Sequence, residues 1–507
     1  MSASVTGIIA AIVIYLGGML YIGYRFSRRT DTVDEFYLGG RKLGPIAAAM
    51  SAEASDMSSW LLMGLPGVAY LTGIADAAWT AIGLAIGTYL NWLIVARKLR
   101  LYTEKTGSIT VPEFFSARYR DPKKTLTLVA ALIIVVFFVP YTASGFAACG
   151  KLFATLFSAN YHVTMIISAA VIITYTALGG FMAVSITDLV QSIIMTVALV
   201  VILLFGVRSA GGMDAVMNNA KSLAGYLSLN QMHNVADNSA SPYTLLTICS
   251  TMAWGLGYFG MPHILLRFMA IQDEDKIRIS RRIGTIWVVI SMGVSIFIGI
   301  VGRAASANGA IAVMEGSDSE TVIVRFASLL AENGLLAALI AGVVLAGILA
   351  STMSTADSQL LTASSAVSKD LFSSVFHIEM DAKKTLRVSR LTLLVIALIG
   401  VFFAWDSTSS VFRIVSFAWA GFGASFGPVV LLALFWKRSN RYGALAGMIC
   451  GGAMIFIWKF LVRPMGGLLD IYELLPAFLI ALAVNVVVSL MTPAPSEEIV
   501  KEFDSIV

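Results

Sequence analysis

The sequence predicts an all-α integral membrane protein that crosses the bilayer many times. Of its 507 residues, 58% are hydrophobic and only 13% are charged, and the mean hydropathy is +0.84. Soluble domains are about 25% charged, so this composition excludes a soluble enzyme or a soluble nucleic-acid-binding domain. A membrane helix needs about 20 apolar residues. Thirteen apolar windows of suitable length, bounded by polar, Gly or Pro residues, occupy most of the chain.

The windows differ in ways that predict their roles. The first lacks a small-residue cleavage site after its apolar stretch, so we interpret it as a retained span and not as a signal peptide. The second and seventh are interrupted by polar residues or glycines. The fourth and ninth are too long for a simple crossing, which predicts tilt or a break. In order, the windows are 5–25, 45–71, 75–97, 125–157, 162–180, 184–207, 242–270, 283–304, 333–365, 386–405, 409–436, 441–462 and 469–492.

Basic residues concentrate in alternate loops. Most of the 35 Lys and Arg residues follow the first, third, seventh, ninth and eleventh windows, and such loops stay in the cytoplasm. This pattern places the N-terminus outside and the C-terminus inside. The net charge of +5 and the pI of 9.0 are therefore explained by topology, and no nucleic-acid partner is expected.

A weak internal symmetry relates windows two to six to windows seven to eleven. Each block begins with an interrupted helix, at 55–59 and at 254–262. Because five is an odd number, consecutive blocks of five spans lie in opposite orientations. Paired interrupted helices point to a transporter site near the bilayer midplane. We expect the two repeats to occupy 45–207 and 242–436, with an extracellular loop over 208–241 between them. An N-terminal helix and loop precede them over 1–44, and two final spans with a tail follow over 437–507.

Two glycine-rich motifs partly match nucleotide-binding patterns, and three cysteines could in principle belong to a metal or disulfide site. Gly255 to Gly260 fits a dinucleotide pattern but lies in an apolar helix. The segment from Gly145 to Lys151 nearly forms a phosphate loop, yet Leu152 stands where Ser or Thr is needed. A nucleotide-driven pump is therefore excluded. The histidines have no ligand spacing, and no metal or disulfide spacing relates Cys149, Cys249 and Cys450.

Polar residues interrupt the second window. Glu53 and Asp56 are three residues apart and share a helical face. A carboxylate in mid-bilayer costs about 2.5–3.5 kcal/mol, so it normally faces a cavity, an ion or a partner. Ser58 and Ser59 compete for backbone hydrogen bonds and free carbonyl oxygens. The alternative is a set of local hydrogen bonds that stabilise the helix. We interpret the segment as an ion or substrate site.

A second polar cluster lies in the ninth window. Ser351, Ser354 and Thr355 share one helical face, and neutral oxygens suit a monovalent hard cation. The alternative is that these hydroxyls bond to their own helix or hold helices together. Asp188 lies at the start of the sixth window. It could cap the helix or lie on the ion path, and the sequence leaves both roles possible. The ninth window also holds Asp357 and Gln359.

Aromatic residues accompany both interruptions. Trp254, Tyr258 and Pro262 are four residues apart, which predicts one face of a glycine-rich helix. Tyr141 follows Pro140 in the fourth window, near an expected break. Aromatic residues in membranes also serve as packing or interfacial belts. Their position in the interrupted segments favours a substrate pocket.

Ordered motifs run along nearly the whole chain. The longest reads ASDMSSWLLMGLPG and starts at Ala54. The others lie at 39–41, 141–145, 183–188, 254–270, 353–355, 417–423 and 443–448. Together these motifs resemble the sodium/solute symporter family, and within it the bacterial proline transporters. The resemblance implies thirteen helices in a LeuT-type core of two inverted five-helix repeats, with one extra N-terminal and two extra C-terminal helices.

The resemblance also implies a function and a site. It implies a sodium-coupled importer of L-proline that works by alternating access in the bacterial inner membrane, with sodium, proline and lipid as partners and no required oligomer. The implied sodium ligands are the carbonyls of Ala54, Met57 and Ser351 and the hydroxyls of Ser354 and Thr355. The implied sodium-linked carboxylates are Asp56 and Asp188. The implied proline pocket comprises Ser58, Ser59, Trp60, Tyr141, Trp254, Tyr258 and Pro262. Glu53, Asp357 and Gln359 are further candidates without an assigned role.

Two residues depart from the family pattern. Other functions are also compatible with part of the sequence. Ser59 replaces a glycine and Ser351 an alanine. The first change bears on the solute, so pantothenate, another small carboxylate or another amino acid is an alternative substrate. A membrane sensor built on a transporter-like domain would carry an output domain, for which 493–507 is too short. A membrane enzyme is disfavoured because no nucleophile lies beside a base.

Overall fold

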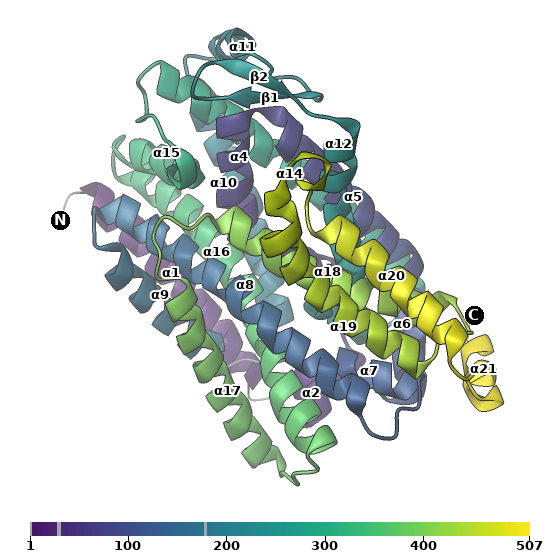
Figure 1. The fold of residues 1–507 in the computed structure, drawn as a ribbon. Helices are drawn as coiled ribbons and strands as arrows, with labels where there is room; N and C mark the ends of the chain where they lie inside the picture. Colours follow the sequence, from purple (N-terminus) through teal and green to yellow (C-terminus); the bar gives the residue numbers. More distant parts are fainter. Residues whose placement is uncertain (1–2, 28–31, 177–179, 507) are drawn as a thin grey trace.

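The computed structural model describes residues 3–27, 32–176 and 180–506, which are mostly helical. The long helices run between two ends of the molecule (Figure 1). One end carries α11 (Met213–Ser222) and a hairpin of β1 (Gln231–Asn234) and β2 (Ser239–Pro242). The other carries α2 (Val33–Leu38), α7 (Val111–Arg118) and α21 (Glu497–Asp504).

Ten helices of the described chain are long and apolar enough to cross a membrane. The most buried of them are α18 and α16, which form the centre of the bundle. One of the ten is a continuous run of α5 (Ile74–Leu90), η3 (Asn91–Val95) and α6 (Ala96–Thr106). The other nine are α1 (Ala3–Ser27), α8 (Thr125–Phe157), α10 (Phe181–Ser209), α14 (Ile277–Ala307), α16 (Leu335–Ser365), α17 (Ala382–Phe403), α18 (Val411–Phe435), α19 (Arg441–Ile457) and α20 (Leu474–Met491).

The other three expected spans consist of shorter apolar helices, so the count of thirteen stays a prediction. The fifth window forms α9 (Tyr161–Thr176). The second and seventh windows are both broken, as their sequences indicate. The second divides into α3 (Pro45–Asp56), η2 (Trp60–Gly64) and α4 (Leu65–Thr72). The seventh divides into α12 (Leu245–Met252), η4 (Ala253–Gly260) and α13 (Pro262–Ala270).

The break considered for the fourth and ninth windows is wrong. Helix α8 runs through Pro140 for 33 residues. Proline is tolerated there because neighbouring helices and local adjustments satisfy the freed backbone groups. Helix α16 is regular through its serine cluster, and π geometry begins only at Ala366, where η7 (Ala366–Val375) follows. The ninth span therefore presents its hydroxyls from an intact helix.

The predicted extracellular loop contains structure that its polar sequence did not indicate. Its two strands pair antiparallel, with Gln231 opposite Pro242. The segment before them contacts the junction of α4 and α5: the Tyr226 hydroxyl donates to the Ala69 carbonyl at 2.7 Å, and Ile74 N donates to the Tyr226 carbonyl at 2.9 Å. The hairpin region thus covers one end of the broken second span.

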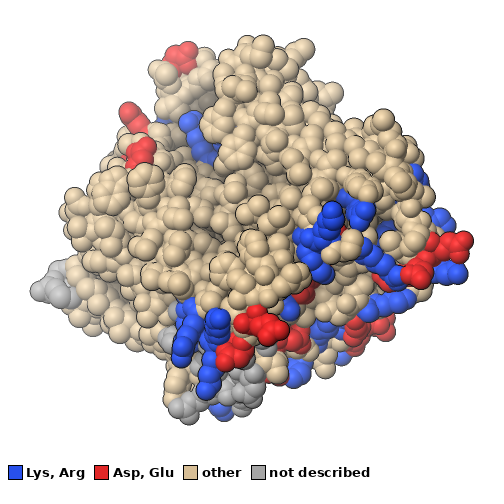
Figure 2. Space-filling view, turned by 60° about the horizontal axis from the view of Figure 1, so that its bottom comes forward, with Lys and Arg blue, Asp and Glu red and all other residues tan. Residues whose placement is uncertain are grey.

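Charged side chains gather at the opposite end. Figure 2 brings that end forward and shows Lys and Arg interspersed with acidic residues there, beside broad areas without charge. This separation agrees with the alternation of basic loops along the sequence. The remaining short elements are η1 (Gly39–Arg41), η5 (Glu274–Lys276), η6 (Gly316–Thr321), α15 (Val322–Ala331), η8 (Trp458–Val462), η9 (Arg463–Met465) and η10 (Gly467–Leu469).

Glycines let α5 approach the broken seventh span closely. A Cβ on Gly87 would lie 2.3 Å from the Gly255 carbonyl oxygen, and one on Gly83 would lie 2.4 Å from the Met252 carbonyl oxygen. No side chain fits at these distances. The glycines therefore fix where η4 lies relative to α5.

Replacing Gly87 with alanine should destabilise the protein by about 1–3 kcal/mol, because overpacking forces backbones apart. Thermal unfolding of the purified protein in detergent measures the loss. Gly18→Ala is the control, because a Cβ there meets nothing within 4 Å. Equal melting temperatures for the two variants would contradict the close approach.

Candidate functional site

The centre of the candidate site is the break after α3. Met57 leaves helical geometry with φ −74° and ψ 33°, and the chain resumes as the π-helix η2. The Ser58 hydroxyl accepts a hydrogen bond from Trp60 N at 3.2 Å, which replaces a backbone acceptor at the break. The Asp56 carbonyl accepts from the Tyr141 hydroxyl at 3.3 Å. Side chains therefore supply part of the hydrogen bonding that the helix gives up.

Four of the five expected sodium ligands meet where α3 faces α16. The Ser354 hydroxyl donates to the Ala54 carbonyl at 2.7 Å and lies 3.1 Å from the Ser351 carbonyl. The Thr355 hydroxyl donates to the same Ser351 carbonyl at 3.1 Å. A hydroxyl that donates its hydrogen keeps its oxygen lone pairs. This group of carbonyl and hydroxyl oxygens has the chemistry that suits a monovalent hard cation.

An aromatic cluster lies beside the break. The Trp254 ring lies 5.8 Å from Trp60, 5.4 Å from Phe412 and 5.3 Å from Tyr472, between ring centroids. Trp419 donates from Nε1 to the Trp254 carbonyl at 2.7 Å. The cluster joins η2, η4, α18 and the segment before α20.

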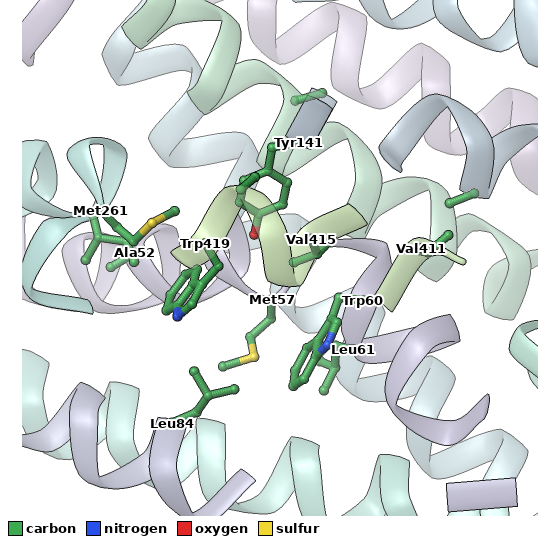
Figure 3. Close-up of a cluster of buried hydrophobic side chains, with 14 of the residues drawn as sticks. Ala52, Met57, Trp60, Leu61, Leu84, Tyr141, Met261, Val411, Val415 and Trp419 are labelled. Carbon is green, nitrogen blue, oxygen red and sulfur yellow. The ribbon is translucent and has the colours of Figure 1, made fainter. Parts of the chain in front are cut away.

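The break and the aromatic cluster are in contact. Figure 3 shows the Met57 side chain between Trp419 and Trp60, with the Tyr141 hydroxyl directed toward it. The Tyr258 ring lies 5.0 Å from Trp419. Trp60, Trp254 and Tyr258 are 3%, 4% and 2% exposed, so the site is closed to solvent in this structure.

The seventh span reaches the site by a geometry that the sequence did not predict. Residues 253–260 form a 3₁₀ helix, in which residues three apart, not four, share a face. The expected single face of Trp254, Tyr258 and Pro262 is therefore wrong. Trp254 and Tyr258 both contact Trp419, whereas Pro262 is the first residue of α13, a position that proline favours.

The two expected sodium-linked carboxylates have strong protein partners. Asp56 accepts a short hydrogen bond from the Tyr258 hydroxyl. Asp188 accepts from Ser51 at 2.6 Å and pairs with Arg267 at 3.1 Å. The pair is fully enclosed, with Asp188 0% and Arg267 1% exposed at the side chain. Arg267 also donates to Ser358 of α16 at 2.5 Å, so the pair ties α10 and α13 to α16.

The remaining candidates lie outside the aromatic cluster. Trp92 donates to Glu53 Oε1 at 3.1 Å. Thr176 donates a short hydrogen bond to Asp357, and Thr142 donates to Gln359 at 3.2 Å. Each of these contacts joins two spans. Ser59 is buried, and its hydroxyl has no hydrogen-bond partner among the described residues.

Sequence reasoning missed the basic partners. Arg267 and Lys151 lie within apolar windows, and a charge at membrane depth signals function or pairing. Lys151 pairs with Glu320 at 2.8 Å. Glu320 also accepts from Phe412 N at 3.2 Å, so this pair anchors the helix that carries Phe412. A search for basic as well as acidic residues within the spans would have found Arg267 and Lys151.

Comparison with known proteins identifies the family. A model of the sodium:solute symporter family matches residues 36–451. The chain belongs to this family. It is 39% identical to the osmoregulated proline transporter OpuE of Bacillus subtilis over 97% of this chain and 96% of that protein. It is 41% identical to the high-affinity proline transporter PutP of the same organism, over 96% and 98%. A sodium/proline symporter of Haemophilus influenzae is 41% identical over 97% and 96%.

Solved structures show the same fold. A Na⁺-coupled sialic acid symporter in a substrate-bound outward-open state superposes with a TM-score of 0.78 at 18% identity, over 97% of this chain and 99% of that one. Mhp1, a nucleobase-cation-symport-1 family transporter in a closed conformation, gives a TM-score of 0.56 at 14% identity, over 92% and 98%. These likenesses confirm the predicted LeuT-type class of fold.

Proposed function

We propose that this symporter imports L-proline together with sodium by alternating access. The proposal is supported by relatives about 40% identical over nearly the whole chain, whose names state proline transport. It is also supported by the closed aromatic site beside the broken second span. Transport of this kind requires no bond to be made or broken.

Two unpartnered donors at the start of η2 support an anionic group on the solute. The Ser59 hydroxyl and Trp60 Nε1 are buried, and neither has a partner among the described residues. A buried donor without an acceptor costs about 1–3 kcal/mol. A solute carboxylate would supply the acceptor. The apolar methylene groups of the pyrrolidine ring would pack between Trp254, Tyr258 and Trp60.

Sodium would act at the junction of α3 and α16. Bound to Ala54, Met57, Ser351, Ser354 and Thr355, it would hold the broken segment in a single geometry, so that the solute binds better after it. Each sodium ion that enters down about 100 mV releases about 2.3 kcal/mol, and a tenfold gradient adds about 1.4 kcal/mol. Together these drive a several hundred-fold accumulation.

The membrane arrangement follows from the same proposal. Two inverted repeats, 45–207 and 242–436, would rock against each other around the site, in the manner of LeuT-type transporters. The hairpin end and the N-terminus would face outward. The charged end and the C-terminal helix α21 would face the cytoplasm, as positive residues require.

Competition for uptake tests the solute. Vesicles that contain the protein should take up labelled proline, and only excess unlabelled proline should suppress uptake fully among a panel that includes pantothenate and other amino acids. Stronger suppression by another solute would assign that solute instead.

Ser59→Ala should weaken proline uptake by about tenfold through the lost hydrogen bond to a charged group.

A further inference from the structure

An apolar cavity lies between α1, α8, α9 and α16, at one margin of the bundle (Figure 1). Its volume is about 320 Å³, whereas an apolar protein cavity of about 150 Å³ already binds benzene. Each of the four helices contributes apolar side chains to the lining, such as Leu16 of α1, Phe153 of α8, Val171 of α9 and Met353 of α16. None of the described residues that line the cavity is charged.

The few polar side chains in the lining offer little to a polar ligand. The Thr164 hydroxyl donates to the Tyr161 carbonyl at 2.9 Å, and the Ser168 hydroxyl donates to the Thr164 carbonyl at 2.7 Å. Both hydroxyl hydrogens are therefore used within α9. Cys149 also lines the cavity, and a thiol is only a weak donor. Because a buried water needs two to four polar partners, the lining suits an apolar ligand and not water.

The cavity opens on the outer surface of α9. Ile167 lines it and is 60% exposed. The lining residues of α9 fall within 164–172, in the middle of this helix. Neither Asp, Glu, Lys nor Arg occurs anywhere in α9. At this depth the outer surface of a membrane helix faces lipid hydrocarbon. The opening therefore faces lipid chains, and headgroups lie too far out to reach it.

The inner wall of the cavity is the back of α16. Leu349 and Met353 line it, and residues four apart share a helical face. Ser351 and Thr355 are each two residues from Met353, which places them about 200° around a helix of 3.6 residues per turn, on the opposite face. The Tyr15 hydroxyl of α1 contacts Met353 Sδ at 3.6 Å. A ligand in the cavity would thus pack behind the serine cluster of α16.

We propose that this cavity holds the hydrocarbon chain of a bilayer lipid, which enters past Ile167 and Val171 and ends against Met353. A cavity without atoms forfeits the dispersion contacts of its lining, and lipid chains are the apolar groups at its opening. Because the lining carries no charge, the site recognises the chain and not the headgroup. The site goes beyond the proposed function and depends neither on the solute nor on sodium.

Photocrosslinking in lipid nanodiscs tests this site. The probe is a phosphatidylcholine with a diazirine in the middle of one acyl chain, and peptide mass spectrometry locates the label. Label should appear at Cys149 or Met353, which are 0% and 1% exposed. Val171→Trp should reduce this label by about tenfold, because overpacking at the opening opposes entry of the chain. Val171→Phe serves if the tryptophan variant does not fold, as judged by its melting temperature.

Ile166→Trp is the matched control. Ile166 lies on the same helix and is 45% exposed, close to the 41% of Val171, but it does not line the cavity. The control should keep the label at Met353. Label confined to outward-facing residues such as Val163 would overturn the proposal, and so would equal label at Met353 in the Val171 and Ile166 variants.

The headgroup gives a second decision. A phosphatidylglycerol probe with the same diazirine chain should label Met353 as strongly as the phosphatidylcholine probe. A severalfold preference for either headgroup would overturn recognition by the chain alone. Since no measurement here involves proline or sodium, failure of the lipid site and failure of the proposed transport function are separate results.

Discussion

Removing both hydroxyls of Ser354 and Thr355 with alanine should raise the sodium concentration for half-maximal proline uptake by about a hundredfold or more. The Ser354 hydroxyl donates to the Ala54 carbonyl, and the Thr355 hydroxyl donates to the Ser351 carbonyl. An interaction with a charged group contributes about 1.5–3 kcal/mol, and each 1.4 kcal/mol is a tenfold change in affinity. Initial uptake rates over a range of sodium concentrations measure the shift.

A matched pair on the same helix separates this effect from general loss of helix packing. Thr362 and Ser365 are also buried, and their hydroxyls donate to carbonyls of their own helix at 2.7 and 2.8 Å. Changing both to alanine should leave the sodium dependence unchanged. Equal shifts of the half-maximal sodium concentration in the two double variants would show that Ser354 and Thr355 do not bind sodium.

Breaking the Asp188 and Arg267 pair should be the most damaging single change to stability. Asp188→Asn leaves a buried guanidinium without its counter-charge, which costs about 3–5 kcal/mol. Thermal unfolding in detergent measures the loss. Asp318→Asn breaks a half-exposed pair with Arg325 and should cost no more than about 1 kcal/mol.

A double variant shows whether the two charges act as a pair. Asp188→Asn combined with Arg267→Gln removes both charges, so much of the stability lost in either single variant should return. If Asp188 is also linked to sodium, as we propose, sodium-driven uptake should remain impaired in the double variant. Additive destabilisation in the double variant would show that each residue acts alone.

The fold was predictable where the signal was long and apolar. Windows of 20 or more apolar residues predicted the membrane helices, and the interrupted motifs from Ala54 and Trp254 located both broken spans. The hairpin at Gln231–Asn234 was not predictable, because short polar strands in a loop have no distinctive periodicity. The continuity of α8 through Pro140 depends on neighbouring helices, which a local pattern does not contain.

The candidate site was predictable in part. Serines and carboxylates in an apolar window indicated the junction of α3 with α16, because polar atoms at membrane depth need partners. The 3₁₀ geometry at Trp254 was missed because a spacing of four was interpreted as an α-helix. Trp419 was recognised only as part of a motif. Its contact with Trp254 is tertiary and leaves no trace in residue spacing.

Proline accumulation in proteoliposomes tests the coupling of sodium to transport most directly. With an inward sodium gradient and an inside-negative potential, internal proline should rise several hundred-fold above the external concentration. With potassium in place of sodium under the same potential, internal proline should at most equal the external concentration. Equal accumulation in the two salts would contradict a sodium ion bound between α3 and α16 as the driving partner.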